Sequence, residues 1–158
     1  DSVAAFDAMS VDDLVQEITL GNVINSESSL IELNQIFITH AAYASDRNLE
    51  LIAYEGGNFM QTTGAAQSVV DKFFSLNRDS RLSDAFVQNF NNFEAAGATT
   101  FFYFLNEDFW TNEGAFGAMR YQDESRTDAP IFDGLMTYIE ATTCWWTDCA
   151  RTLPADPP

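Results

Sequence analysis

Two runs of apolar, β-branched and aromatic residues constrain the fold of this chain more than any other feature. The first, NLELIAYEGG, spans 48–57 and ends in a glutamate followed by two glycines. The second, TTFFYFL, spans 99–105 and leads into Asn-Glu-Asp. Runs of this kind, closed by turn residues, predict buried β-strands. Because the segment between them has helical periodicity, and helical crossovers join parallel strands, the sequence predicts an α/β fold with parallel strands and flanking helices.

Helical segments account for most of the remaining chain, since apolar residues recur there at helical spacing. The predicted helices run from Ser10 to Gly21, from Ser28 or Ser29 through Ala44, over 65–76, from Ser80 or Ser83 to Gly97, and from Pro130 through Ile139. The predicted order is therefore helix, strand, helices, strand, helix. Two strands do not close a barrel, so either further strands are unrecognised in this pattern or the chain is part of a larger sheet.

The charge of the chain limits its partners. The formal net charge is −17, and only seven of the 158 residues are Lys or Arg. Nucleic-acid binding requires clusters of basic side chains on the phosphates, so a nucleic-acid partner is not expected. No stretch approaches the roughly 18 apolar residues of a membrane helix, and no membrane partner is expected either. The aromatic content is 14%, with fourteen Phe, and this surplus fits a sugar-stacking or partner-binding surface.

Two cysteines, Cys144 and Cys149, lie close together near the end of the sequence. No His or second Cys pair accompanies them, so a zinc site is not expected, and a short-loop disulfide is favoured over two free buried thiols. A disulfide would place the protein outside the reducing cytosol, that is, as an extracellular protein. We therefore divide the chain into a main segment, 1–143, and a disulfide-bearing tail, 144–158. Neighbouring carboxylates lack the alternating spacing of a calcium loop, so neither a metal nor a cofactor is expected.

Four stretches together resemble a known family: LIAYEGGNF, NRDSRLSDAFVQNFNNFEAAGATTFFYFL, GAFGAMRYQD and PIFDGLMTYI. They look like the C-terminal part of a (β/α)₈ glycoside-hydrolase-like domain found in large secreted bacterial proteins, which are often described as cellulose-binding. The resemblance covers about Val11 to Ala141. It implies a partial TIM-barrel-like segment, in which 48–57 holds barrel strand 7 and 99–105 is strand 8. One departure is Phe116, which stands where the similar proteins have Trp.

The resemblance also implies a role for Glu55. Retaining glycosidases of this barrel type place their nucleophilic carboxylate at the end of strand 7. A second carboxylic acid, about 5 Å away, protonates the leaving oxygen. That acid usually comes from strand 4, which these 158 residues do not include; Glu107, Asp108 and Glu113 follow strand 8 and could crowd the same rim.

Two functions follow from this sequence. In the first, the chain is a glycoside-hydrolase-like, carbohydrate-active domain with Glu55 as nucleophile, and its sugar site is lined by Tyr54, Asn58, Asp108 and Trp110. Aromatic faces stack on sugar rings and amides bind hydroxyls. In the second, the chain is a non-catalytic extracellular structural protein derived from such a barrel. It would then assemble with other copies or with a larger partner through exposed sheet edges.

Overall fold

The computed structural model describes residues 6–21 and 29–143, and within them the chain adopts a mixed α/β fold. The α/β class, the parallel pairing and the flanking helices are as the sequence predicted. The tail 144–158, with the pair Cys144 and Cys149, lies outside the described residues. The helices and strands are α2 (Val11–Leu20), α3 (Leu30–Ser45), β1 (Ile52–Gly56), β2 (Met60–Gln61), α4 (Gln67–Asn77), α5 (Arg81–Ala95), β3 (Thr100–Tyr103), β4 (Gly114–Ala115) and α6 (Pro130–Ala141).

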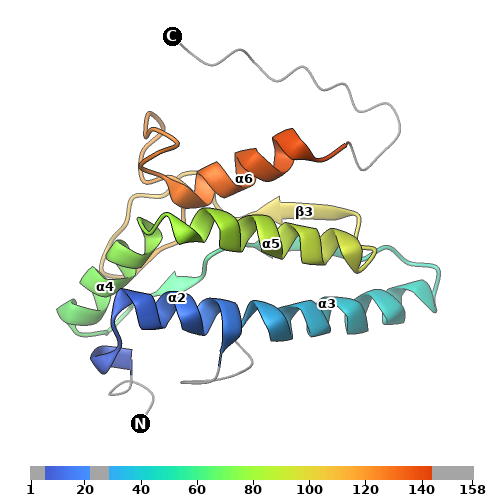
Figure 1. The fold of residues 1–158 in the computed structure, drawn as a ribbon, viewed down its shortest axis with the longest axis horizontal. Helices are drawn as coiled ribbons and strands as arrows, with labels where there is room; N and C mark the ends of the chain where they lie inside the picture. Colours follow the sequence, from blue (N-terminus) through green and yellow to red (C-terminus); the bar gives the residue numbers. More distant parts are fainter. Residues whose placement is uncertain (1–5, 22–28, 144–158) are drawn as a thin grey trace.

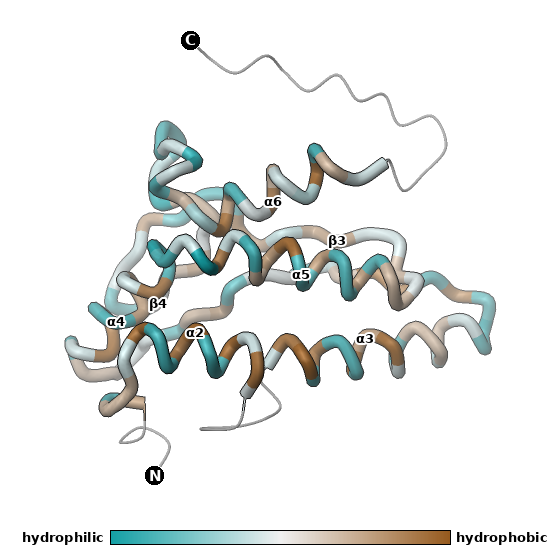
Figure 2. Tube along the Cα trace, in the orientation of Figure 1, coloured by the Kyte–Doolittle hydropathy of each residue, from teal (hydrophilic) through white to brown (hydrophobic). Residues whose placement is uncertain are grey.

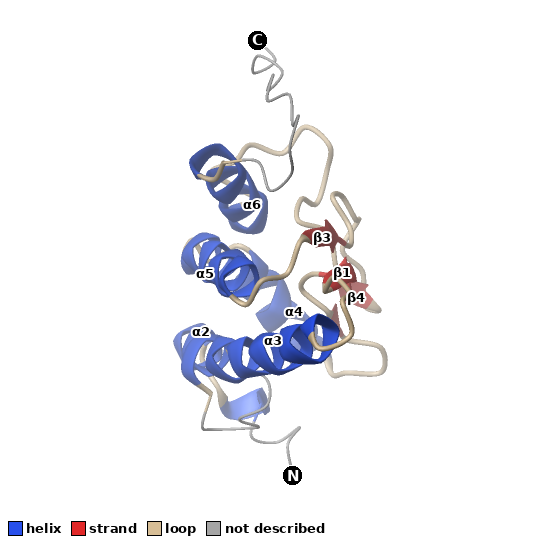
Figure 3. Cartoon of the chain, turned by 90° about the vertical axis from the view of Figure 1, so that its right-hand side faces the viewer, coloured by secondary structure: helices blue, strands red, loops and turns tan. Residues whose placement is uncertain are grey.

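The helices and strands form two layers. In the view of Figure 3 the long helices lie on one side and the strands on the other, with α5 between α6 and the α2–α3 pair. The strands β1 and β3 pair in parallel, with Ile52 opposite Thr100 and Ala53 opposite Phe101. The helices α4 and α5 form the crossover between them (Figure 1). Among the described residues the sheet stops at these two strands, so it forms no closed barrel.

Local signals account for the helix starts. Ser10 accepts a hydrogen bond from the Asp13 amide, and the Asp13 carboxylate in turn accepts from the Ser10 amide, so the two residues form a capping box for α2. The Ser29 hydroxyl caps α3 in the same way by accepting from the Glu32 amide. Pro130 begins α6, where its fixed φ suits the first turn and its missing N–H costs nothing.

The core lies between the two layers and among the helices, and Figure 2 shows the hydrophobic residues that recur along these helices. Phe93 of α5 is one of its largest fully buried side chains. Its ring packs edge-on against Phe37 of α3 at 5.0 Å and against Phe101 of β3 at 5.2 Å. Phe90, one turn earlier, also packs against Phe101. Three elements that are distant in sequence therefore meet at one aromatic cluster.

The prediction of two buried strands was wrong for one face of the sheet. Tyr54 is 72% exposed and Phe102 is 56% exposed, and Ile52 beside them is also exposed. The helices cover the face that carries Phe101, and no described helix lies beyond the other face (Figure 3). Parallel sheets are normally covered on both faces, so this face is the least typical feature of the fold.

A second pairing was absent from the sequence prediction. The two-residue strands β2 and β4 pair antiparallel, with Met60 opposite Ala115 and Gln61 opposite Gly114. The Thr62 amide extends this pairing by donating to the Glu113 carbonyl. The loop after β1 is thereby joined to the loop after β3. Within the described ranges no helix is long and apolar enough to cross a membrane.

Candidate functional site

The carboxyl ends of β1 and β3 lie at one edge of the sheet because the strands are parallel. Polar and ligand-binding side chains gather at such edges in α/β folds. Glu55 is the second-to-last residue of β1, and Asp108 follows the end of β3. The chain segments that follow the two strands pair with each other through β2 and β4. This edge is the candidate site.

A bulge in β1 determines where Glu55 points. Ala53 pairs with Phe101 and Gly56 with Tyr103, so β1 uses three residues where β3 uses two. In a regular strand Glu55 would oppose Tyr103 and face the helices, since side chains alternate between faces. The extra residue leaves both Tyr54 and Glu55 exposed. Glu55 makes no hydrogen bond or ion pair with any described residue, and its carboxylate is therefore available to a ligand.

The two glycines after Glu55 allow β3 to approach β1 closely. A Cβ on Gly56 would lie 2.1 Å from the Phe101 ring, and one on Gly57 would lie 2.6 Å from the Phe104 carbonyl oxygen. The Phe104 amide donates to the Gly56 carbonyl at 2.7 Å. The glycines were predicted to form an exit turn, but Gly56 still belongs to β1. The two glycines therefore allow β1 and β3 to stay in close contact at the carboxyl edge, next to Glu55.

Asn58 belongs to a buried hydrogen-bond network. Its Nδ2 donates to the Ala115 carbonyl at 3.0 Å and to Asn77 Oδ1 at 3.3 Å, while the Tyr103 hydroxyl donates to its Oδ1. Burial raises the pKa of Tyr103 well above its ordinary value, although a hydrogen bond with the Asn58 backbone opposes this shift. Tyr103 therefore remains a neutral donor. Asn58 ties β1, β3 and β4 together, so its amide already has partners other than a sugar.

Trp110 is buried, with only 5% of its surface exposed. The guanidinium carbons of Arg78 and Arg120 lie 5.2 and 5.5 Å from its ring centroid, and Phe74 packs against it at 5.5 Å. Its surroundings therefore leave no open face for a sugar ring. The exposed aromatic side chains near it are Phe109 and Tyr121, which the sequence did not single out.

The predicted site residues thus fall into two groups. Glu55 and Tyr54 are exposed at the edge, and Asp108 beside it is half-buried. Asn58 and Trp110 are buried and serve the framework. Phe59 and Phe102 were missed, although alternation along the second strand run could have indicated that Phe102 faces away from Phe101. Phe59 stacks on Phe104 at 6.1 Å, which extends the open aromatic face.

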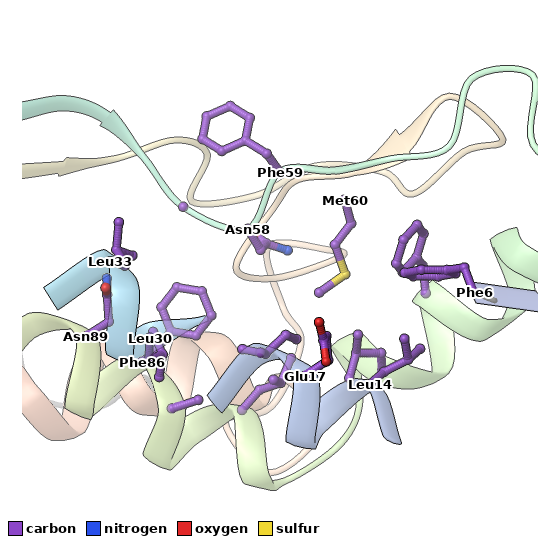
Figure 4. Close-up of a pocket in the computed structure, with 16 residues that line it drawn as sticks. Phe6, Leu14, Glu17, Leu30, Leu33, Asn58, Phe59, Met60, Phe86 and Asn89 are labelled. Atoms are coloured by element: carbon purple, nitrogen blue, oxygen red, sulfur yellow. The ribbon is translucent and has the colours of Figure 1, made fainter. Parts of the chain in front are cut away.

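A cavity of about 500 Å³ lies beneath the loop that carries Asn58 (Figure 4). Its lining is apolar except for Glu17, Asn58, Asn89 and backbone groups. Sugar hydroxyls need many hydrogen-bond partners, and Asn58 is already bonded, so the lining suits an apolar group better than a sugar. Figure 4 labels the following lining residues: Phe6, Leu14, Glu17, Leu30, Leu33, Asn58, Phe59, Met60, Phe86 and Asn89.

Comparisons of the chain with protein-family models, with curated proteins and with solved structures gave no match. Within 6–21 and 29–143, no three His, Cys, Asp or Glu side chains come together as metal ligands.

Proposed function

We propose that the chain is the strand 7 and strand 8 portion of a secreted, glycoside-hydrolase-like barrel, with Glu55 at the position of the retaining nucleophile. The bulge in β1 carries this proposal, since it turns the Glu55 carboxylate to solvent at the carboxyl end of a parallel strand. Bulges next to active sites commonly re-aim a side chain in this way. The carbohydrate is the partner, with exposed Tyr54 beside the carboxylate as a stacking surface.

The chemistry needs a second carboxylic acid. Glu55 Oε would attack the anomeric carbon while the acid protonates the leaving oxygen, and water would then hydrolyse the glycosyl ester. In this proposal a further barrel strand supplies the acid, from the same polypeptide or from an assembled partner. That strand would also pair with a free edge of the β1–β3 sheet.

Covalent labelling tests the proposal. An aryl 2-deoxy-2-fluoroglycoside should react with the natural polypeptide containing these residues, release the aryl oxide and leave a sugar ester on Glu55. The fluorine slows hydrolysis of this ester, so peptide mass spectrometry should find the added mass on the peptide that contains Tyr54 and Glu55. Glycoside hydrolysis with the label on another carboxylate, or no hydrolysis of any glycoside tested, would overturn the assignment of Glu55.

The open aromatic face favours a second candidate function, self-assembly without catalysis. Ile52, Tyr54, Phe59 and Phe102 are uncharged although the chain carries a net charge of −17. Two copies could bury these side chains against each other while their acidic residues stay in solvent, so the proposed occupant of this face is a second copy.

Sedimentation velocity distinguishes this second candidate. The chain should associate as its concentration rises, and Phe102→Asp should return it to a monomer because a charge would be buried in the interface. Ile38→Asp, at an exposed apolar position on α3, is the matched control and should leave association unchanged. A wild-type chain that stays monomeric at all concentrations would exclude self-assembly through this face.

A further inference from the structure

Three aromatic rings surround the guanidinium group of Arg120. The guanidinium carbon lies 5.5 Å from the ring centroids of Phe109 and Trp110 and 5.3 Å from that of Tyr121. Contacts at this range between a guanidinium and aromatic faces are attractive, and they hold the side chain in one position. Trp110 is buried, whereas Phe109 is 63% and Tyr121 is 39% exposed. The Arg120 side chain is therefore pre-positioned between one buried ring and two rings that face solvent.

The guanidinium of Arg120 lacks a carboxylate partner among the described residues. The nearby Glu124 carboxylate forms an ion pair with Arg78 at 2.9 Å and accepts from the Arg120 backbone amide at 2.6 Å. The guanidinium of Arg120 forms no ion pair with any described carboxylate. Glu124 therefore offsets the charge of Arg78, whereas the charge of the Arg120 guanidinium has no carboxylate paired with it among the described residues.

Hydrogen-bond donors also exceed acceptors here. Arg120 Nε and Trp110 Nε1 are both buried, and neither finds an acceptor among the described residues. Buried donors in native proteins usually have partners, so one donor of this guanidinium and the neighbouring indole N–H are both short of an acceptor. A carboxylate is the strongest acceptor for a guanidinium and can bind it with two parallel hydrogen bonds.

This cluster lies beyond the carboxyl end of β3, the neighbour of the strand that carries Glu55. Arg120 follows Met119, which bridges to Glu107 just past the carboxyl end of β3. The Asp108 amide also donates to the Met119 carbonyl, which fixes the segment that carries Arg120 against the end of β3. The polar groups at the ends of β1 and β3 and the Arg120 cluster therefore belong to one edge.

We propose that Arg120, with Phe109 and Tyr121, forms a subsite for a sugar that carries a carboxylate, such as a uronic acid. The guanidinium Nη groups bind the carboxylate, and the exposed ring faces stack on the pyranose. This inference rests on the proposed glycosidase-like function and names acidic saccharides as its substrate class. A neutral sugar would leave the charge unpaired, so the subsite selects through the carboxylate.

Binding experiments test the subsite directly. Calorimetric titrations at about 0.15 M salt, where the Debye length is about 8 Å, reduce the repulsion from distant carboxylates. A glucuronate-containing oligosaccharide should bind more tightly than its neutral glucose counterpart. Arg120→Gln should lower the affinity for the acidic oligosaccharide about 10- to 100-fold, because one charged hydrogen-bonding group is lost. The affinity for the neutral oligosaccharide should not change. Titration should also shift the indole N–H resonance of Trp110 in NMR spectra.

Further variants separate recognition from folding. Arg120→Lys keeps the charge but loses the paired geometry, so it should bind with intermediate affinity. Phe109→Ala removes an exposed ring and should lower the affinity for both saccharides, while the thermal unfolding temperature stays unchanged. Arg47→Gln is the matched control. Arg47 also lies over a tyrosine ring, at 6.0 Å from that of Tyr43, in the turn that follows α3, and its substitution should change neither affinity.

Each outcome has one meaning. Equal affinity for acidic and neutral saccharides, or full binding by a folded Arg120→Gln variant, overturns the subsite. Inorganic sulfate binding as tightly as the glucuronate ligand overturns the assignment to a sugar. Binding that depends on Arg120, without hydrolysis that depends on Glu55, would support the subsite and reject the proposed catalysis. Hydrolysis that depends on Glu55, without a preference for acidic saccharides, would support the catalysis and reject the subsite.

Discussion

Replacing Glu55 with Gln is expected to lower glycoside hydrolysis by on the order of 10⁶-fold, the scale seen when a covalent nucleophile is removed. The amide is nearly the same size as the carboxylate but cannot attack the anomeric carbon. Because Glu55 is exposed and contacts no described partner, its substitution should leave the unfolding temperature unchanged. The measurement is kcat for an aryl glycoside, made on the natural polypeptide that contains these residues.

Two further variants make this result specific. Glu50→Gln is the matched control: Glu50 precedes β1, at the opposite edge of the sheet, and accepts only a long bond from Thr99. The Glu50→Gln variant should hydrolyse the aryl glycoside at the rate of the wild type. Glu55→Ala should be rescued by azide, whose nitrogen bonds to the anomeric carbon as the aryl oxide leaves, giving a glycosyl azide. Undiminished hydrolysis by Glu55→Gln would reject the nucleophile assignment.

Replacing Phe93 with Ala is expected to cost about 3–5 kcal/mol of the free energy of unfolding. The ring is 1% exposed and contacts Phe37 and Phe101 edge-on, so its removal leaves a cavity where α3, α5 and β3 meet. Domains are stable by only about 5–15 kcal/mol, so this variant should approach the limit of folding. Urea denaturation followed by circular dichroism measures the loss as a lower midpoint with an unchanged slope.

Phe102→Ala is the matched control for the Phe93 variant. Phe102 is the same residue type and lies on β3 beside Phe101, but its ring points to the open face of the sheet and is 56% exposed. In dilute solution its loss should change stability by no more than about 0.5 kcal/mol. Equal losses at the two positions would mean that the open face is covered in the folded chain, contrary to the architecture described above.

The glycosidase-like proposal and the open face of the sheet are connected. Parallel strands are normally covered on both faces, and the helices here cover only one. In a barrel, the face opposite the helices points inward and is filled by bulky side chains. Ile52 and Phe102 have the character of such a filling, whereas Tyr54 lies beside Glu55 at the carboxyl end of β1. In self-assembly, a second copy would cover the same side chains. Covalent labelling of Glu55 would indicate the glycosidase-like function, and association in sedimentation velocity would indicate self-assembly.

The sequence by itself determined the local structure of this chain. Ser10 and Ser29 cap their helices as expected because a hydroxyl next to the first turn acts within a few residues. The two strand runs, their parallel direction and the helices between them follow from periodicity and from the length of the crossover. The same strand run ends in Glu55, so the sequence also predicted a carboxylate at the carboxyl end of a strand.

Only the tertiary structure decided which side chains are exposed. The sequence gives no sign of the bulge in β1, because a bulge depends on how β3 pairs with it, and this bulge turns Glu55 to solvent. Asn58 and Trp110 have residue types suited to binding sugars, but long-range contacts with Asn77, Ala115, Arg78 and Arg120 make them part of the framework. Arg120 gains its importance in the same way, since unpaired charge depends on neighbours brought together by folding.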